Sequence, residues 1–129
     1  KGMMINDAYN ASPESMKAAL LAFERYQTKA TKIAVLGDMA ELGAASAFWH
    51  RQLGRFLRKV PSLTSIVLVG SQVEWTKKTL PVGLTVAHVA TWQEAKEVLD
   101  KQLKGDALVL VKGSRSMELD KLVSEISEK

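Results

Sequence analysis

The stretch Lys32–Gly43, KIAVLGDMAELG, predicts the fold of this chain. It opens with four apolar residues in a row, 33–36, and an unbroken apolar run of this length is typical of a parallel strand covered by helices on both faces. The dipeptide Gly37-Asp38 follows and places an acidic side chain at the end of the strand. Two further apolar runs, 66–69 and 107–111, also end at glycine or Lys-Gly and precede helical patterns.

Strands and helical patterns alternate along the whole chain. Strands are expected at 2–6, 33–36, 66–70, 84–89 and 107–111. Helices are expected from Pro13 with Ser12 as its cap, over 44–60 and 73–79, behind a capping box from Thr91 to Glu94, and from near Ser116. This order predicts one domain over residues 1–129, with an α/β fold. We expect a Rossmann-like, doubly wound, mostly parallel sheet of about five strands flanked by helices, whose strand order the sequence leaves open.

The composition is that of an ordinary globular protein and excludes several classes. Of the 129 residues, 47% are hydrophobic and 25% are charged, and none is cysteine, which excludes disulfides and thiolate chemistry. No run approaches the roughly 20 apolar residues of a membrane span, and no signal-peptide core is present. The net charge of +4 fits a solvated surface or anion binding, and no basic block interleaved with aromatic residues indicates nucleic acid.

Three polar clusters follow predicted strands, at 7–10, 38–41 and 112–116. Because parallel strands end at one edge of a sheet, where ligands bind, these clusters are expected to converge. Asp7, Asn10 and Asp38 fit either turn and capping roles or ligand contacts.

The last cluster favours binding of an anion, either a carboxylate or a phosphate. It holds two cations and two hydroxyl groups ahead of a helix start. The planar guanidinium of Arg115 can grip a carboxylate, and Lys112 would act as a point charge.

Other chemistry is not indicated. The chain has neither a G-x-x-x-x-G-K-[ST] phosphate loop nor a G-x-G-x-x-G dinucleotide fingerprint. His50 and His88 lie far apart without partners at ligand spacing, so both are interpreted as surface or packing histidines. No nucleophile–base pair is present. We therefore predict no catalytic residue and no metal ligand in this chain.

Three motifs together resemble one family. The segments DAYNASP at 7–13, LGDMAELG at 36–43 and VKGSRS at 111–116 occur in the order found in the carboxyl-terminal domain of the Mur ligases, and the resemblance covers almost the whole chain. It is greatest for the ligases that add D-Ala-D-Ala. Sister ligases carry a histidine in the first motif, and the tripeptide-forming member has Lys-Gly-His-Glu in the third. Ser12 stands where family members often carry Asn, and either residue caps a helix.

The resemblance implies an activity for the complete enzyme. Mur ligases have three domains and use ATP and Mg²⁺, and the metal is held mainly by the central domain. This member joins UDP-MurNAc-tripeptide to D-Ala-D-Ala through an acyl phosphate, during peptidoglycan precursor synthesis in the bacterial cytoplasm. A monomer is expected, without nucleic acid or membrane insertion. Since the chain begins one residue before its first strand, we expect the amino-terminal and central ATPase domains to be absent, and the fragment to fold but be inactive.

The resemblance also implies roles for individual residues. The nucleotide is expected near Asp7, Tyr9 and Asn10, with Asp7 on the ribose hydroxyls and Asn10 facing the phosphates. The D-Ala-D-Ala carboxylate is expected to face Lys112, Ser114 and Arg115, and the dipeptide pocket to be bordered by Asp38 and Glu41. Two alternatives stay open: another Mur-type ligase, such as the diaminopimelate- or lysine-adding member, and a non-catalytic α/β binding module.

Overall fold

A computed structural model describes residues 2–8, 10–103 and 105–127. The strands are β1 (Gly2–Asp7), β2 (Thr31–Gly37), β3 (Leu63–Val69), β4 (Thr85–Val89) and β5 (Ala107–Lys112). The α-helices are α1 (Pro13–Arg25), α2 (Ser46–Phe56), α3 (Val73–Lys77), α4 (Trp92–Gln102) and α5 (Leu119–Ser127). Short 3₁₀ helices are η1 (Gly43–Ala45), η2 (Leu57–Lys59) and η3 (Arg115–Met117). The predicted alternation of strands and helices is confirmed.

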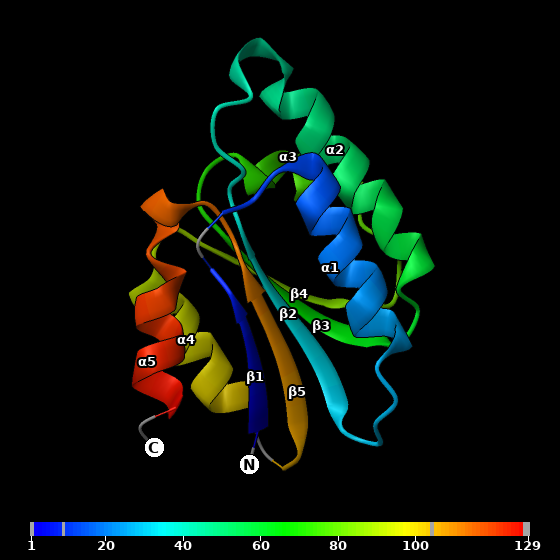
Figure 1. Cartoon of the computed structure of the whole chain (residues 1–129), viewed down its shortest axis with the longest axis vertical. Helices are drawn as coiled ribbons and strands as arrows, with labels where there is room; N and C mark the ends of the chain where they lie inside the picture. The colour runs from blue at the N-terminus through cyan, green and yellow to red at the C-terminus, as the bar shows by residue number, and fades with distance from the viewer. Residues whose placement is uncertain (1, 9, 104, 128–129) are drawn as a thin grey trace.

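The five strands form one parallel sheet in the order β1-β5-β2-β3-β4. Figure 1 shows α1, α2 and α3 on one face of the sheet and α4 and α5 on the other. The predicted doubly wound α/β fold is therefore confirmed, and the strand order is now defined. The last strand in sequence, β5, lies between β1 and β2, so the carboxyl end of β5 is flanked by the ends of both.

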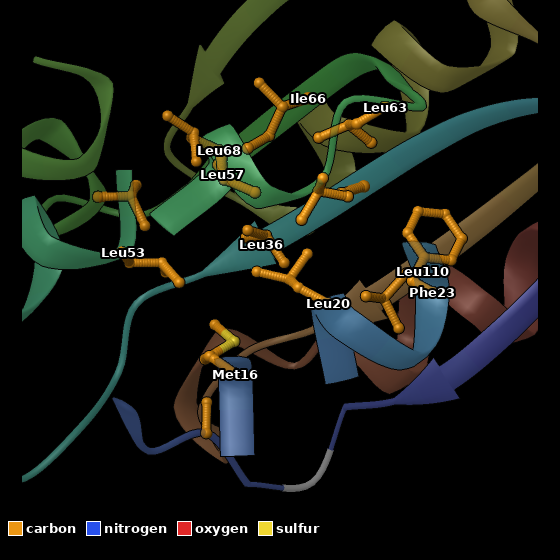
Figure 2. Packing of buried hydrophobic residues seen from close by; sticks show 14 of the residues in the cluster. Met16, Leu20, Phe23, Leu36, Leu53, Leu57, Leu63, Ile66, Leu68 and Leu110 are labelled. Atoms are coloured by element: carbon orange, nitrogen blue, oxygen red, sulfur yellow. The ribbon is translucent and has the colours of Figure 1, made fainter. Parts of the chain in front are cut away.

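Each face of the sheet carries its own hydrophobic core. On the first face, Met16, Leu20 and Phe23 of α1 pack against Leu36 of β2 and Leu110 of β5, as Figure 2 shows. The spacing of the three helix residues places them on one side of α1, as the sequence predicted. On the second face, α4 and α5 supply four buried side chains: Ala95, Leu99, Leu119 and Leu122.

The pattern of burial explains why the apolar runs become strands. All six residues of β5 are buried, as are six of the seven in β2, because both strands lie inside the sheet with helices on both sides. At the edge, β1 leaves Met3 54% and Ile5 37% exposed. Full burial of one large apolar side chain stabilises the fold by about 1.5–3 kcal/mol, so each inner strand contributes more hydrophobic stabilisation than the edge strand β1.

The predicted helix starts at Ser12 and Thr91 are confirmed. The Ser12 hydroxyl accepts a hydrogen bond from the backbone N–H of Ser15, and Thr91 and Glu94 form the expected reciprocal capping box. Each cap satisfies backbone N–H groups that have no partner within the helix.

Two predicted helix boundaries were wrong. The expected helix over 44–60 is divided into η1, α2 and η2. The last α-helix begins at Leu119 rather than near Ser116, because Glu118 adopts a left-handed conformation, with φ of 55°, between η3 and α5. A left-handed residue cannot continue a right-handed helix. The polar cluster at 112–116 therefore leads into the short helix η3 and not directly into α5.

The chain leaves neighbouring strands toward opposite faces of the sheet. After β1 and β2 it turns to α1 and α2, whereas after β5 it turns to α5 on the other face. In open α/β sheets, a ligand site forms where the connections diverge in this way, beyond the carboxyl ends of the strands. The fold therefore places the candidate site around the end of β5.

Candidate functional site

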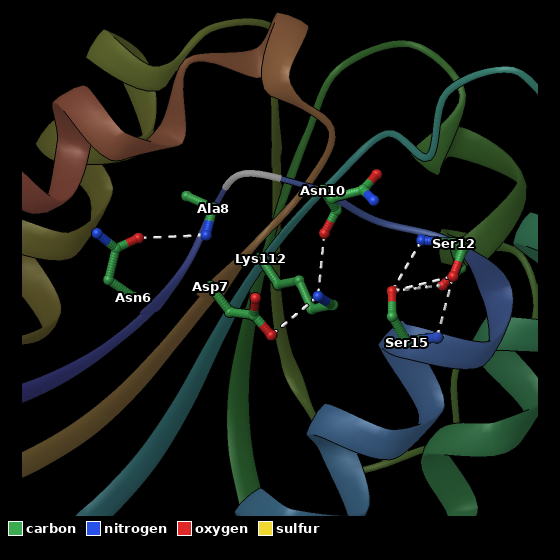
Figure 3. A network of polar contacts seen from close by, with 7 residues as sticks. All are labelled: Asn6, Asp7, Ala8, Asn10, Ser12, Ser15 and Lys112. Carbon is green, nitrogen blue, oxygen red and sulfur yellow. Dashed lines mark hydrogen bonds and ion pairs between the residues drawn. The ribbon is translucent and has the colours of Figure 1, made fainter.

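An ion pair joins the ends of the first and last strands. The Nζ atom of Lys112 lies 2.8 Å from Oδ2 of Asp7 and donates a second hydrogen bond, of 3.0 Å, to the backbone carbonyl oxygen of Asn10 (Figure 3). The Lys112 side chain is 3% exposed and that of Asp7 is 48% exposed. Lys112 is thus held inside the protein, while the Asp7 carboxylate keeps a face open to solvent.

This contact shows whether the polar clusters at 7–10, 38–41 and 112–116 lie at one edge of the sheet, as expected. Asp7 pairs with Lys112 in the register of β1 and β5, and Lys112 also pairs with Leu36 of β2, so the three strand ends form one rim. Arg115 follows Lys112 by three residues and lies on the same edge as Asp7. The predicted convergence is therefore confirmed.

The ammonium group of Lys112 is largely occupied by contacts within the protein. The predicted contact between Lys112 and a dipeptide carboxylate stays a prediction, and two of the three N–H donors of its ammonium group are already used. Tyr9, predicted near the nucleotide, lies outside the described residues.

Asp38 caps the segment that enters α3. Its Oδ1 accepts a hydrogen bond of 2.9 Å from the N–H of Val73, and its Oδ2 accepts one of 3.2 Å from the N–H of Ser71. Asp38 thus has a capping role, but the capped segment follows β3 and is not the turn after Asp38 itself, where the capping interpretation placed it. Gly70 has φ of 120°, and a Cβ atom there would lie 2.5 Å from the Asp38 carboxylate, so the close approach requires glycine.

A pocket of about 390 Å³ opens beside this cap. Its lining consists of Asp38, Met39, Ala40, Glu41, Leu42, Gly43, Ser46, Gln72, Ser114 and Ser116. The second and third polar clusters thus share one cavity, while Lys112 lies behind it on the Asp7 side. The two walls are tied together, since the N–H of Ser114 donates a hydrogen bond of 2.9 Å to the carbonyl oxygen of Asp38.

The walls approach closely because glycines lie where they meet. A Cβ atom on Gly113 would lie 2.9 Å from the Cα atom of Gly37, which a larger residue does not tolerate without moving the backbone. The Ser114 side chain is buried and its Oγ lies 3.0 Å from Oγ of Ser116. Arg115 and Glu41 are exposed, and Arg115 forms no ion pair within the described part of the chain.

The buried position of His50 beside the pocket was not predicted from the sequence. This side chain is fully buried, and its Nε2 accepts a hydrogen bond of 3.0 Å from the backbone N–H of Met39 in the pocket wall. The interpretation as a packing histidine holds, but the contact with the pocket was not foreseen. His88 lies elsewhere, with Nε2 2.7 Å from the carbonyl oxygen of Gly70 and Nδ1 3.2 Å from Glu74.

Two features are absent from the described residues. Residues 2–8, 10–103 and 105–127 contain no group of three or more His, Cys, Asp or Glu side chains that could hold a metal ion. None of the helices described here has both the length and the apolar character that crossing a membrane requires.

Comparison with known families assigns the domain. Residues 1–115 match the family described as "Mur ligase, glutamate ligase domain". The chain belongs to this family, and the resemblance inferred from the three motifs is confirmed.

The two relatives described here share the same protein name. The chain is 33% identical over 129 residues to the UDP-N-acetylmuramoyl-tripeptide–D-alanyl-D-alanine ligase of Bacillus subtilis, covering 97% of this chain and 28% of the relative. It is 32% identical over 127 residues to the ligase of that name in Escherichia coli, covering 98% of this chain and 27% of the relative. The chain thus spans about 28% of the length of such relatives.

Solved structures agree with the sequence comparison. The crystal structure of MurF from Acinetobacter baumannii has a TM-score of 0.83 at 32% identity, covering 98% of this chain and 27% of that one. The structure of MurF ligase from Thermotoga maritima in complex with ADP has a TM-score of 0.76 at 25% identity, covering 95% of this chain and 27% of that one.

Proposed function

We propose that this chain is the carboxyl-terminal domain of an ATP-dependent ligase that adds D-Ala-D-Ala to UDP-MurNAc-tripeptide. The observation that carries the proposal is the Asp7–Lys112 ion pair, which brings the first and third family motifs to one rim. The names of the relatives support the choice among Mur ligases. In the proposed reaction, the tripeptide carboxylate is first phosphorylated, and the amine of the dipeptide then attacks the acyl phosphate and displaces phosphate.

The nucleotide side of the site is assigned to Asp7, Tyr9 and Asn10. Asp7 is half-exposed and gives one carboxylate oxygen to Lys112, which leaves the other oxygen to accept a hydrogen bond from a ribose hydroxyl. Lys112 also holds the Asn10 carbonyl, so it fixes the segment that would face the phosphates. The ADP complex of the Thermotoga maritima relative supports a nucleotide site in this family.

The dipeptide side is assigned to the pocket between Asp38 and Ser116. Arg115 is the cation we assign to the dipeptide carboxylate, because it is exposed beside the pocket and has no ion-pair partner in the described ranges. Ser114 is buried in the pocket wall, where its hydroxyl can donate a further hydrogen bond. Lys112 adds positive charge behind this wall, although Asp7 offsets most of it.

The residues described here do not form a Mg²⁺ site. They lack a cluster of acidic or histidine ligands, so no step of the reaction is assigned to a metal in this chain. We propose that another domain of the complete enzyme holds the metal. The cytoplasmic location and the monomeric state stay predictions.

The test uses the complete ligase that contains this domain, with phosphate release measured in the presence of UDP-MurNAc-tripeptide and ATP. We expect release to depend on D-Ala-D-Ala and not on diaminopimelate or lysine. Dependence on diaminopimelate or lysine instead would assign the chain to a sister ligase. Absence of turnover with all three acceptors would favour a non-catalytic module.

A matched pair of arginine variants tests the dipeptide assignment. Loss of charge-assisted hydrogen bonds costs about 1.5–3 kcal/mol, so Arg115→Ala should raise the KM for D-Ala-D-Ala about 10- to 100-fold. Arg58→Ala is the control, because Arg58 is also exposed but lies in η2, just before the amino end of β3. Equal KM values in the two variants would contradict the role of Arg115.

A further inference from the structure

One wall of the pocket, Asp38–Gly43, has few backbone anchors, and we call it the pocket segment. After Asp38 it leaves the sheet, and the hydrogen bond from the Met39 N–H to Nε2 of His50 is the first contact that holds it, at 3.0 Å. Farther along, the described backbone hydrogen bonds lie at its end, where the carbonyl oxygens of Leu42 and Gly43 accept from the N–H groups of Ala45 and Ser46. His50 therefore supplies the hydrogen bond that holds the backbone at the start of the segment, where the Met39 side chain is also buried in the core.

The contacts of the ring define its protonation state. Because Nε2 accepts the hydrogen bond from Met39, it carries no proton, and the imidazole is neutral. The proton then lies on Nδ1, which donates to the carbonyl oxygen of Ser46 at 2.8 Å. The Ser46 hydroxyl in turn donates to Oε1 of Gln72 at 2.8 Å. Met39, Ser46 and Gln72 all line the pocket, so one buried ring connects three parts of its wall.

The ring itself is held rigidly. His50 is 0% exposed in α2, and its backbone carbonyl accepts a hydrogen bond of 2.9 Å from the hydroxyl of Thr76 in α3. The helix α3 is also tied to the pocket segment through the capping contacts of Asp38. A contact from such a fixed position orients the segment without touching a bound ligand.

We propose that His50 is a positioning residue for the acceptor pocket: its unprotonated Nε2 holds the Met39 N–H, and thereby sets the path of the segment that the dipeptide contacts. The identity of the ligand rests on the proposed function. The hydrogen bond to Met39 does not depend on it.

Two polar substitutions of similar size distinguish the contribution of Nε2 of His50 from that of Nδ1. In His50→Gln, the amide group reaches the former position of Nε2, so its oxygen can accept the hydrogen bond from Met39. In His50→Asn, the shorter side chain reaches only the position of Nδ1, so the contact with Ser46 can form and the Met39 N–H loses its acceptor. The Asn variant should therefore free the pocket segment, while the Gln variant should retain its path.

The first measurement is amide hydrogen exchange, followed by NMR, on the 129-residue chain. In His50→Asn the Met39 amide should exchange at least about tenfold faster than in the wild type, and in His50→Gln within about threefold of it. The Gly70 amide, which donates to Val89 at the end of the sheet, is the internal reference and should change equally little in both. Unchanged Met39 exchange in the Asn variant would overturn the proposal. A parallel rise at Gly70 would also overturn it, because it would indicate general loosening of the fold.

The second measurement uses the same variants in the complete ligase. We expect His50→Asn to raise the KM for D-Ala-D-Ala about tenfold while the KM for ATP stays within about twofold of the wild-type value. In His50→Gln, the KM for D-Ala-D-Ala should stay close to that of the wild type. His88→Gln is the control, since the contacts described for this histidine are to Gly70 and Glu74, outside the pocket segment. Equal rises of both KM values would overturn the proposal. A wild-type enzyme that does not use D-Ala-D-Ala would refute the proposed function instead, and the exchange result then decides the role of His50.

Discussion

Removing either partner of the Asp7–Lys112 ion pair should have unequal effects on stability. Asp7→Ala leaves an ammonium group that is 3% exposed, with the Asn10 carbonyl as its one remaining partner among the described contacts. Lys112→Met replaces that group by an apolar side chain of similar length. It leaves behind a carboxylate that is already 48% exposed and hydrated. The first change creates an uncompensated buried charge, and the second removes the charge that was expensive to bury.

The size of the difference follows from these exposures. Removing one partner of a fully buried pair costs about 3–5 kcal/mol. Because Asp7 is half-exposed, water already screens part of the attraction, and we expect Asp7→Ala to cost about 2–3 kcal/mol. Lys112→Met should cost about 1 kcal/mol or less, since the exposed Asn10 carbonyl can bond to water instead.

The assay is urea unfolding of the 129-residue chain, its two single variants and the double variant. A gap of about 1–2 kcal/mol between the single variants corresponds to roughly 1 M urea in the midpoint. The double variant should be more stable than Asp7→Ala alone by at least about 1 kcal/mol, because it no longer buries an unpaired ammonium group. The reasoning is refuted if Lys112→Met loses as much stability as Asp7→Ala, or if the double variant is the least stable of the four proteins.

Three further predictions concern stability, and urea unfolding measures each. Ser12→Ala should cost about 1 kcal/mol through loss of the helix cap, whereas Ser12→Asn should be nearly neutral. Gly113→Ala should cost about 2 kcal/mol or more, because the added methyl group meets the backbone of Gly37. Gly37→Ala should cost less, since its methyl group first meets Cγ of the Met117 side chain, at 2.9 Å, rather than backbone. Asp38→Ala should cost about 2–3 kcal/mol by releasing two capped N–H groups, and Asp38→Asn clearly less. Equal losses within any pair would contradict the assigned contact.

The elements of the fold could be predicted from the sequence, but the order of the strands could not. An apolar run such as 107–111 reports that a strand is buried on both faces, and the structure confirms this for β5. The run does not report which strands lie beside it. The position of β5 between β1 and β2 depends on how the helices share the two faces, which no local pattern encodes.

The location of the candidate site could be predicted from the sequence, but most contacts of its side chains could not. Lys112 was expected to offer a free point charge, and the structure buries it because β5 is an inner strand and Asp7 ends the neighbouring one. For Asp38, the sequence left capping and ligand contact open, since a carboxylate after a strand suits both. The capping contact could not be foreseen, because the start of α3 lies beside Asp38 only in the folded chain, and the ligand contact stays a prediction.

The sequence did hold a signal for His50. It precedes Leu53 by three residues and Leu57 by seven, which is the spacing of one buried side of a helix. A polar residue on such a side needs a hydrogen-bond partner, so burial and an internal contact could both have been expected. Its partner, the N–H of Met39, lies in an irregular segment whose path the sequence does not define.

The placement of β5 has a consequence for how the chain is made. Among the described strands, β1 is hydrogen-bonded to β5 alone, and Asp7 is separated from its partner Lys112 by 105 positions in the sequence. During synthesis, the first strand therefore has no sheet neighbour until almost the whole domain has left the ribosome. Pairings between segments so distant in sequence form slowly, since a long loop must close first. We therefore expect the rim that carries Asp7 to be completed late in folding, when the final strand inserts between the first two.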